Sequence, residues 1–245
     1  MSFRHRLSLL AAFAVAVTAF AASSSGASAA GNLAGGAVGS DISWPQCGGP
    51  GPSDPYSFGV VGVTGGAPFS GNDCLDAEMV WAIHTGTTHL YINLDFGQRK
   101  DGPLTCGDGD VGCQAYNYGY DSANWAVTYA HQKTNGLSDG VPVWWLDVET
   151  ENVWSDNPDQ NSYVIQGALD FFQRHYNHIV GIYSTSYQWS EIAGNFAPPN
   201  VPNWVAGSGE LYDWGQCSAS LWPGGQVWMI QYLNNDLDLD QNLAC

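Results

Sequence analysis

The chain has 245 residues and is strongly acidic, with 23 Asp and Glu against 6 Lys and Arg and a formal charge of −17 at pH 7. An acidic surface repels phosphates and anionic lipids, which excludes nucleic acids and anionic membranes as partners. Because 44% of the residues are hydrophobic and 13% aromatic, the chain can bury a core, which excludes intrinsic disorder. A single domain of roughly 200 residues is the natural size.

Residues 1–29 have the features of a secretory signal peptide. Arg4 and Arg6 form a short basic head, an apolar run covers Leu7–Ala22, and Ala27-Ser28-Ala29 matches an A-x-A cleavage pattern. The run is shorter than the ~20 residues of a spanning helix, so we expect a secreted, extracellular protein without a membrane span. Cleavage would remove two arginines and no acid, leaving 23 acids against 4 bases and a charge of −19.

Six cysteines lie after this segment, at Cys47, Cys74, Cys106, Cys113, Cys217 and Cys245. In an exported protein this even number indicates up to three disulfides, which could pair in fifteen ways. We expect the sequential pairing, Cys47–Cys74, Cys106–Cys113 and Cys217–Cys245. The chain lacks the close C-x-x-C pairs of zinc sites, so we predict no metal site.

Predicted strands and helices alternate along residues 41–245, after a predicted flexible lead-in at residues 30–40. Short apolar or β-branched runs predict strands at Asp41–Trp44, Phe58–Thr64, His89–Leu94, Val141–Val148, His178–Ser184, Asn203–Ala206 and Gln226–Tyr232. Helical patterns cover Asp73–Gly86, Ser122–Gly136 and Pro158–Tyr176. This alternation predicts an α/β fold, a single irregular (β/α) barrel similar to a TIM barrel. No G-x-G-x-x-G or Walker pattern follows a strand, so no nucleotide cofactor is expected.

Two carboxylates, Asp147 and Glu149, follow an apolar strand at a spacing of i and i+2. On a strand this spacing places both on one face, about 6.6 Å apart. The carboxyl end of a barrel strand faces the active-site mouth. Burial among Trp144, Trp145 and Val148 would raise a carboxyl pKa, as would the second carboxylate, which is what a general acid for glycosidic cleavage requires. The alternative is a strand end whose acids are simply solvated.

Two more acids could join this pair. Asp41 opens the first predicted strand and Asp240 closes the last, in Leu239–Ala244. First and last strands are neighbours in a closed barrel, so both acids could converge on the pair. Asp236, Asp238 and Asp240 also form an acidic run that could be solvated, and the pattern does not choose between Asp238 and Asp240.

A series of short motifs extends over residues 41–244. They are Asp41-Ile42-Ser43-Trp44-Pro45-Gln46, Phe58–Gly65, Asp147-Val148-Glu149, Ile182-Tyr183-Ser184, Asn203–Ala206, Trp228 with Gln231-Tyr232, and Asp240-Gln241-Asn242. Their order resembles the lysozymes of glycoside hydrolase family 25 and their relatives of uncertain activity. The resemblance implies an irregular (β/α) barrel that cleaves β-1,4 bonds between N-acetylmuramic acid and N-acetylglucosamine in peptidoglycan. It implies Glu149 as the general acid, Asp147 as the group that steadies charge at the reacting sugar, and Asp41 and Asp240 as the rest of the acidic cluster.

Substrate contacts are expected from side chains at the ends of the predicted strands. We assign them to Trp44, Asn93, Tyr183, Trp204 and Tyr232. Aromatic rings can stack on sugar rings while their N–H or O–H groups make polar contacts. Core packing is the alternative for each ring.

The chain also departs from the family pattern. Gly62 and Gly65 stand where the family carries a Lys and an acid, and Tyr91-Ile92-Asn93 replaces an aromatic–His pair. A charge of −19 would also be repelled by acidic wall polymers. Two hypotheses follow: a monomeric, cofactor-free hydrolase acting on a polysaccharide, or a non-catalytic barrel that binds glycans or serves at the cell surface. The presence of both Asp147 and Glu149 favours the hydrolase.

Overall fold

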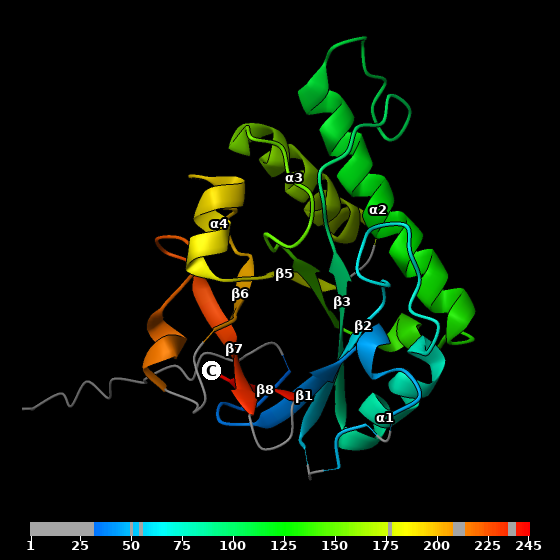
Figure 1. Ribbon diagram of the computed structural model, residues 1–245, viewed down its shortest axis with the longest axis vertical. Coiled ribbons are helices and arrows are strands. Elements are labelled where there is room, and N and C mark those ends of the chain that lie inside the picture. Colours follow the sequence, from blue (N-terminus) through cyan, green and yellow to red (C-terminus); the bar gives the residue numbers. More distant parts are fainter. Residues whose placement is uncertain (1–31, 50, 54–55, 176–177, 208–213, 235–238) are drawn as a thin grey trace, which may run out of the picture.

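Eight strands close into a barrel in the computed structural model (Figure 1). The structure describes residues 32–49, 51–53, 56–175, 178–207, 214–234 and 239–245; the predicted signal peptide lies outside them. The strands are β1 Val38–Ile42, β2 Phe58–Gly62, β3 Thr87–Asn93, β4 Val143–Asp147, β5 Ile179–Ser184, β6 Pro202–Val205, β7 Gln226–Asn234 and β8 Leu239–Ala244. Their order around the barrel is their order in the chain, which confirms the predicted fold class.

Strand direction decides which acids meet. Strands β1 to β7 run parallel, whereas β8 runs antiparallel to both β7 and β1. The start of β8 therefore lies at the end of the barrel where the other strands finish. Asp41 lies near the end of β1 and Asp240 near the start of β8, the reverse of the predicted order. This reversal brings both to the same end of the barrel.

The first strand begins earlier than predicted. Gly39 and Ser40 pair with Phe58 and Gly59 of β2, and Val38 pairs with Leu243 of β8. The prediction of a flexible lead-in is therefore wrong for residues 38–40, because two neighbouring strands provide backbone hydrogen bonds to them.

Four α-helices are described, together with three short 3-10 helices. They are α1 Leu75–Thr85, α2 Val111–Lys133, α3 Pro158–His175 and α4 Ser186–Ala193, with η1 Trp44–Gln46, η2 Leu137–Gly140 and η3 Trp214–Ser218. Helix α3 begins at Pro158 as predicted. Helix α2 begins at Val111 rather than Ser122, because Asp110 accepts a hydrogen bond from the backbone N–H of Cys113 at 3.2 Å and so caps its first turn. Helix α4 was not predicted; Thr185 caps it.

Helices α2 and α3 lie side by side along one flank of the barrel (Figure 1). Their backbones approach closely at two glycines. A Cβ at Gly119 would lie 1.9 Å from the carbonyl oxygen of Val164, and one at Gly167 would lie 2.1 Å from that of Tyr116. Any larger residue at either position would force the helices apart.

The core has two parts, one inside the barrel and one between the sheet and the helices. Alternation along β4 places Trp145 inside with Phe58 and Met229, and Trp144 and Val148 outside against the helices. The expectation that Trp144 and Val148 surround the acid pair is thus wrong, since they face away from it. Trp145 lies on the same face as Asp147.

Three disulfides connect the predicted pairs. Cys47–Cys74, Cys106–Cys113 and Cys217–Cys245 have Cα–Cα distances of 5.4, 5.6 and 5.6 Å. The first joins the end of η1 to the start of α1, and the third joins η3 to the residue after β8. The sequential pairing is confirmed, and it is consistent with an extracellular protein.

Candidate active site

A pocket of about 130 Å³ lies at the end of the barrel where the parallel strands finish. Its lining residues are Asp41, Tyr91, Asp147, Glu149, Tyr183, Trp204, Gln231 and Asp240. All four predicted catalytic acids are among them, contributed by β1, β4, the loop after β4, and β8. Asp238, the alternative to Asp240, lies outside the described residues.

Asp147 and Glu149 share a hydrogen bond, and both line this pocket. Asp147 is the last residue of β4 and only 3% exposed, whereas Glu149 lies two residues beyond the strand and is half-buried. Burial, the charge of Glu149 and a hydrogen bond shared with it raise the pKa of Asp147 well above its ordinary 3.8. Burial and the charge of Glu151 raise the pKa of Glu149 to about 7, although the hydrogen bond with Asp147 acts in the opposite direction. The pair therefore holds a proton at neutral pH.

Asn93 holds the buried member of the pair. Its Nδ2 donates a hydrogen bond to Oδ2 of Asp147. Thr64 fixes the amide, since its hydroxyl donates to Oδ1 of Asn93 at 2.6 Å and accepts from the Asn93 backbone N–H at 3.0 Å. Asn93 does not line the pocket, so its expected contact with substrate is corrected to a contact with Asp147.

Asp41, near the end of β1, is held by two amides. Nε2 of Gln231 donates to both carboxylate oxygens at 3.1 Å, and Nδ2 of Asn242 donates to Oδ2 at 2.6 Å. Burial is the main cause that raises the pKa of Asp41 to about 7, followed by the charge of Asp240, while the two amides lower it. Asp41 is therefore fixed in orientation and titrates near neutral pH.

Two aromatic side chains orient these amides in turn. The hydroxyl of Tyr183 donates to Oε1 of Gln231 at 2.7 Å, and the indole N–H of Trp204 donates to Oδ1 of Asn242 at 2.8 Å. Because each amide oxygen accepts a hydrogen bond, each amide nitrogen is directed at Asp41. Tyr183 and Trp204, which are predicted to contact substrate, both line the pocket and also support Asp41.

Tyr91 lines the pocket although the sequence analysis did not select it. A Cβ at Gly62 would lie 2.7 Å from Cζ of Tyr91 and 2.6 Å from Cβ of Ser43, so the glycine makes room for the tyrosine ring. Burial raises the pKa of Tyr91 well above 10.0, with a smaller opposite effect from its hydrogen bond to Ser43. Tyr91 therefore remains a neutral phenol. The unusual glycine at 62 was the signal that could have indicated a bulky neighbour.

Two predicted substrate contacts lie elsewhere. Tyr232 is 6% exposed and packs in the core between sheet and helices, because alternation along β7 directs Gln231 into the barrel and Tyr232 out of it. Gln231 lines the pocket instead. Trp44 lies on η1, just after β1, and is 51% exposed without lining the pocket.

The described part of the chain contains no group of three or more His, Cys, Asp or Glu side chains arranged to hold a metal ion. Nor does any helix described here have the length and apolarity needed to cross a membrane.

Comparisons with known proteins relate the chain to lysozymes. A family model described as Lysozyme-like protein 1 matches residues 115–210, which include Asp147 and Glu149. The search of curated proteins found no similar sequence. Among solved structures, the chain is similar to a family GH25 lysozyme from Aspergillus fumigatus, with 14% identity, a TM-score of 0.57, and 85% of this chain and 93% of that chain covered.

Two further solved structures are similar. The bacterial lysozyme from Streptomyces coelicolor has 16% identity and a TM-score of 0.52, with 85% of this chain and 92% of that chain covered. The catalytic domain of endolysin ply40 from bacteriophage P40 of Listeria monocytogenes has 19% identity and a TM-score of 0.54, with 86% and 93% covered. At these identities the likeness establishes the fold. The resemblance to family 25 lysozymes is confirmed at that level.

Proposed function

We propose that the protein is a secreted glycoside hydrolase of the lysozyme type, which cleaves β-1,4 bonds in peptidoglycan with Glu149 as general acid. The observation that carries the proposal is the convergence of four carboxyl groups in one pocket at the barrel mouth. Carboxylates repel one another and lose hydration on burial, so their grouping costs stability, and no Lys or Arg is among the lining residues to offset it. Such a cost is typical of a catalytic site.

Glu149 is the member of the acid pair that substrate can reach, since it is half-buried while Asp147 is enclosed. A pKa of about 7 keeps much of Glu149 protonated at neutral pH. In the bond-breaking step, its proton passes to the glycosidic oxygen. The bond between that oxygen and the anomeric carbon breaks, its electron pair stays with the leaving sugar as a hydroxyl, and positive charge develops at the anomeric carbon.

The remaining carboxyl groups act on that positive charge. Asp41, held by two amides, stabilises the charge electrostatically when ionised. Asp147, held by Asn93, does the same once it has passed its own proton to Glu149 through their shared hydrogen bond. A water molecule then adds its oxygen to the anomeric carbon and gives its proton to a carboxylate, which completes hydrolysis. The separation of the reacting carboxyls determines whether configuration is retained or inverted, and proton NMR of the first product reads it out.

Sugar contacts are proposed for the aromatic rings around the mouth. Tyr183 and Trp204 line the acid pocket, and the exposed ring of Trp44 stands on the segment that follows β1. Their faces suit the apolar face of a pyranose. The three disulfides and the sequence of residues 1–29 support secretion.

A non-catalytic glycan-binding barrel is the second candidate. The observation that favours it is the size of the acid pocket, about 130 Å³, which is below the 300–1,000 Å³ common for ligand sites. The charge of −19 also disfavours approach to acidic wall polymers. Under this alternative the four acids would be present in the pocket, but the protein would not hydrolyse the glycan that it binds.

The test is product analysis by mass spectrometry after incubation of the mature protein with peptidoglycan and with chitin oligomers. New muramic-acid reducing ends from the wild type, absent with Glu149→Gln, would support the proposal. Cleavage of chitin oligomers alone would retain the mechanism and change the substrate. Intact binding with no new ends from either glycan would support the non-catalytic barrel.

A further inference from the structure

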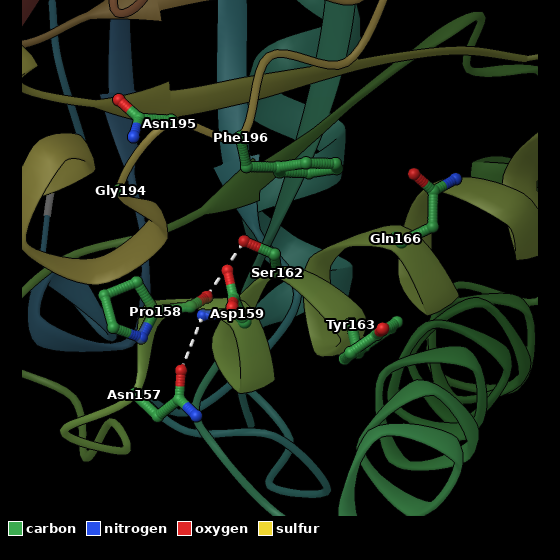
Figure 2. A pocket seen from close by; sticks show the side chains of 9 residues that line it. All are labelled: Asn157, Pro158, Asp159, Ser162, Tyr163, Gln166, Gly194, Asn195 and Phe196. Carbon is green, nitrogen blue, oxygen red and sulfur yellow. Dashed lines mark hydrogen bonds between the residues drawn. The ribbon is translucent and has the colours of Figure 1, made fainter.

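A second cavity of about 630 Å³ lies outside the barrel, between the first turns of α3 and the end of α4 (Figure 2). It is several times larger than the acid pocket, and the two share no lining residue. The residues used below are Asn157, Asp159, Tyr163, Gln166, Asn195 and Phe196. Nothing in the proposed chemistry of the acid pocket uses them.

Two aromatic rings border this cavity. Tyr163 of α3 is 50% exposed, and its ring lies against α2, where a Cβ at Gly112 would come within 2.9 Å of it. Phe196 follows α4, and its ring is held by stacking on Trp189 at 6.1 Å between centroids. Figure 2 shows Phe196 entering from the α4 side and Tyr163 standing on α3. Both rings are therefore positioned by packing while exposing surface to a ligand.

Neutral amides supply the polar part of the lining. Oδ1 of Asn157 accepts from the backbone N–H of Asp159 at 3.1 Å, which leaves its NH₂ group to donate. Nε2 of Gln166 donates to Asp170 at 2.6 Å, which leaves its carbonyl oxygen to accept. Asn195 is exposed and presents both an amide donor and an acceptor. The cavity thus offers donors and acceptors without opposing charges.

The charge of the lining selects the class of ligand. Asp159 is the one charged residue among those lining the cavity, and no base is present, which disfavours phosphates and carboxylates. A neutral sugar chain combines apolar ring faces with hydroxyl and acetamido groups, which match aromatic rings and amides respectively. The volume of about 630 Å³ falls in the range of ligand sites.

A short, well-anchored loop connects this cavity to the acid pocket. The backbone carbonyl of Glu149 accepts a hydrogen bond from the indole N–H of Trp154 at 2.8 Å, and the loop then reaches Asn157 at the start of α3. Ser155 is fixed by its N–H donating to Asn161 at 3.0 Å. We propose that the cavity between α3 and α4 is a second binding site for a neutral, N-acetylated glycan segment. The choice of glycan rests on the proposed function.

The experiment uses ¹⁵N-labelled mature protein carrying Glu149→Gln, titrated with chitohexaose and followed by NMR. We expect the side-chain amide signals of Asn157, Gln166 and Asn195 to shift. Tyr163→Ala, added to the same protein, should weaken this binding by about three- to tenfold, the effect of one aromatic contact. Tyr187→Ala is the matched control, because Tyr187 is 69% exposed and lines neither cavity; it should leave the affinity unchanged.

Several results would overturn the proposal. They are shifts confined to the acid pocket, equal weakening by Tyr187→Ala and Tyr163→Ala, or no shift of any side-chain amide signal with chitohexaose. The hydrolysis assay on wild type separates this failure from that of the proposed function. If the wild type produces new reducing ends but the amide signals do not shift, only the proposed glycan site in the cavity is refuted. If the amide signals shift but no reducing ends form, the hydrolase is refuted and the glycan site is supported.

Discussion

The barrel interior holds ionisable groups both where the parallel strands begin, its closed end, and where they finish at the acid pocket, its open end. Burial lowers the pKa of the histidine at the closed end and raises the pKa values of the acids at the open end. At the closed end, His89 is fully buried and its pKa falls to about 3 through burial, so it stays neutral. Its Nδ1 accepts from the indole N–H of Trp145 at 3.3 Å, and its Nε2 lies 3.1 Å from Oδ1 of Asn32. At the open end, Asp41 and Glu149 keep some exposed surface, and burial raises the pKa of each to about 7.

Burial favours the neutral form at both ends, but the surroundings differ. His89 packs against the rings of Phe58 and Trp145, and these apolar neighbours do not stabilise a positive charge on the imidazole. Burial is the main cause that raises the pKa values of Asp41 and Glu149 to about 7, and the charges of Asp240 and Glu151 respectively add to it. The closed end therefore stabilises the fold through apolar packing. The open end destabilises it by burying acids, and these acids can exchange protons near neutral pH.

The largest effect should come from removing the proton donor at the open end. Glu149→Gln keeps the shape of the side chain but removes the acid, so turnover of peptidoglycan should fall by about 100- to 10,000-fold. The melting temperature should not fall, because the neutral glutamine avoids the cost of ionising a partly buried carboxyl group.

Glu151→Gln is the matched control for that substitution. The charge of Glu151 raises the pKa of Glu149, so Glu151→Gln should lower that pKa while retaining turnover. The alkaline limb of the pH–rate profile should therefore move to lower pH than in the wild type. A pH–rate profile measures both variants. Wild-type turnover with Glu149→Gln would remove Glu149 from the proposed role.

The closed end should show the second effect, on stability. Trp145 is 1% exposed and packs against Trp204 with ring centroids 5.8 Å apart, so Trp145→Ala leaves a large cavity. We expect a loss of about 3–5 kcal/mol in the free energy of unfolding, measured by urea denaturation. Trp44→Ala, which truncates an exposed tryptophan, is the control and should lose far less. Equal losses of unfolding free energy in Trp145→Ala and Trp44→Ala would contradict the conclusion that apolar packing at the closed end stabilises the fold.

Stability should also depend on pH because of the open end. Folded Asp41 and Glu149 keep their protons up to about pH 7, whereas the unfolded carboxyls release them near 3.8 and 4.5. The folded state binds more protons between these limits, so stability falls as pH rises from about 4 to 7. Melting curves should give a higher melting temperature at about pH 5.5 than at about pH 7.5.

Asp41→Asn should flatten this dependence, since it removes one of the carboxyl groups whose pKa is raised on folding. Asp101→Asn, at an exposed position, should leave it unchanged. An Asp41→Asn variant with the slope of wild type would show that Asp41 does not titrate in this range.

The smallest effect is expected at the rim of the open end. Trp44→Ala removes a ring that is already 51% exposed, so folding should be nearly unaffected. If the ring stacks on a sugar, KM should rise by about three- to tenfold with kcat retained. Steady-state kinetics on soluble peptidoglycan fragments provide the measurement, and an unchanged KM would remove Trp44 from the substrate contacts.

Much of this arrangement could be predicted from local sequence patterns. The alternation of strands and helices indicated the barrel, and Asp147 and Glu149 were found because an apolar strand ends in them. The sequential disulfide pairing was expected and is confirmed, although the sequence alone allowed fifteen pairings. Gln231 was overlooked in favour of Tyr232, because a period of two separates the faces of a strand without saying which one is inside.

The sequence by itself determined the periodicity of each element and the acids at the strand ends, because these depend on neighbours in the chain. Only the tertiary structure decided which face of each strand closes around the interior and that β8 runs antiparallel, bringing Asp240 beside Asp41. It also joined Asn93 to Asp147, far apart in sequence. Barrel closure sets these contacts through hydrogen bonds between strands and the burial of one face of each, and no local pattern encodes that choice.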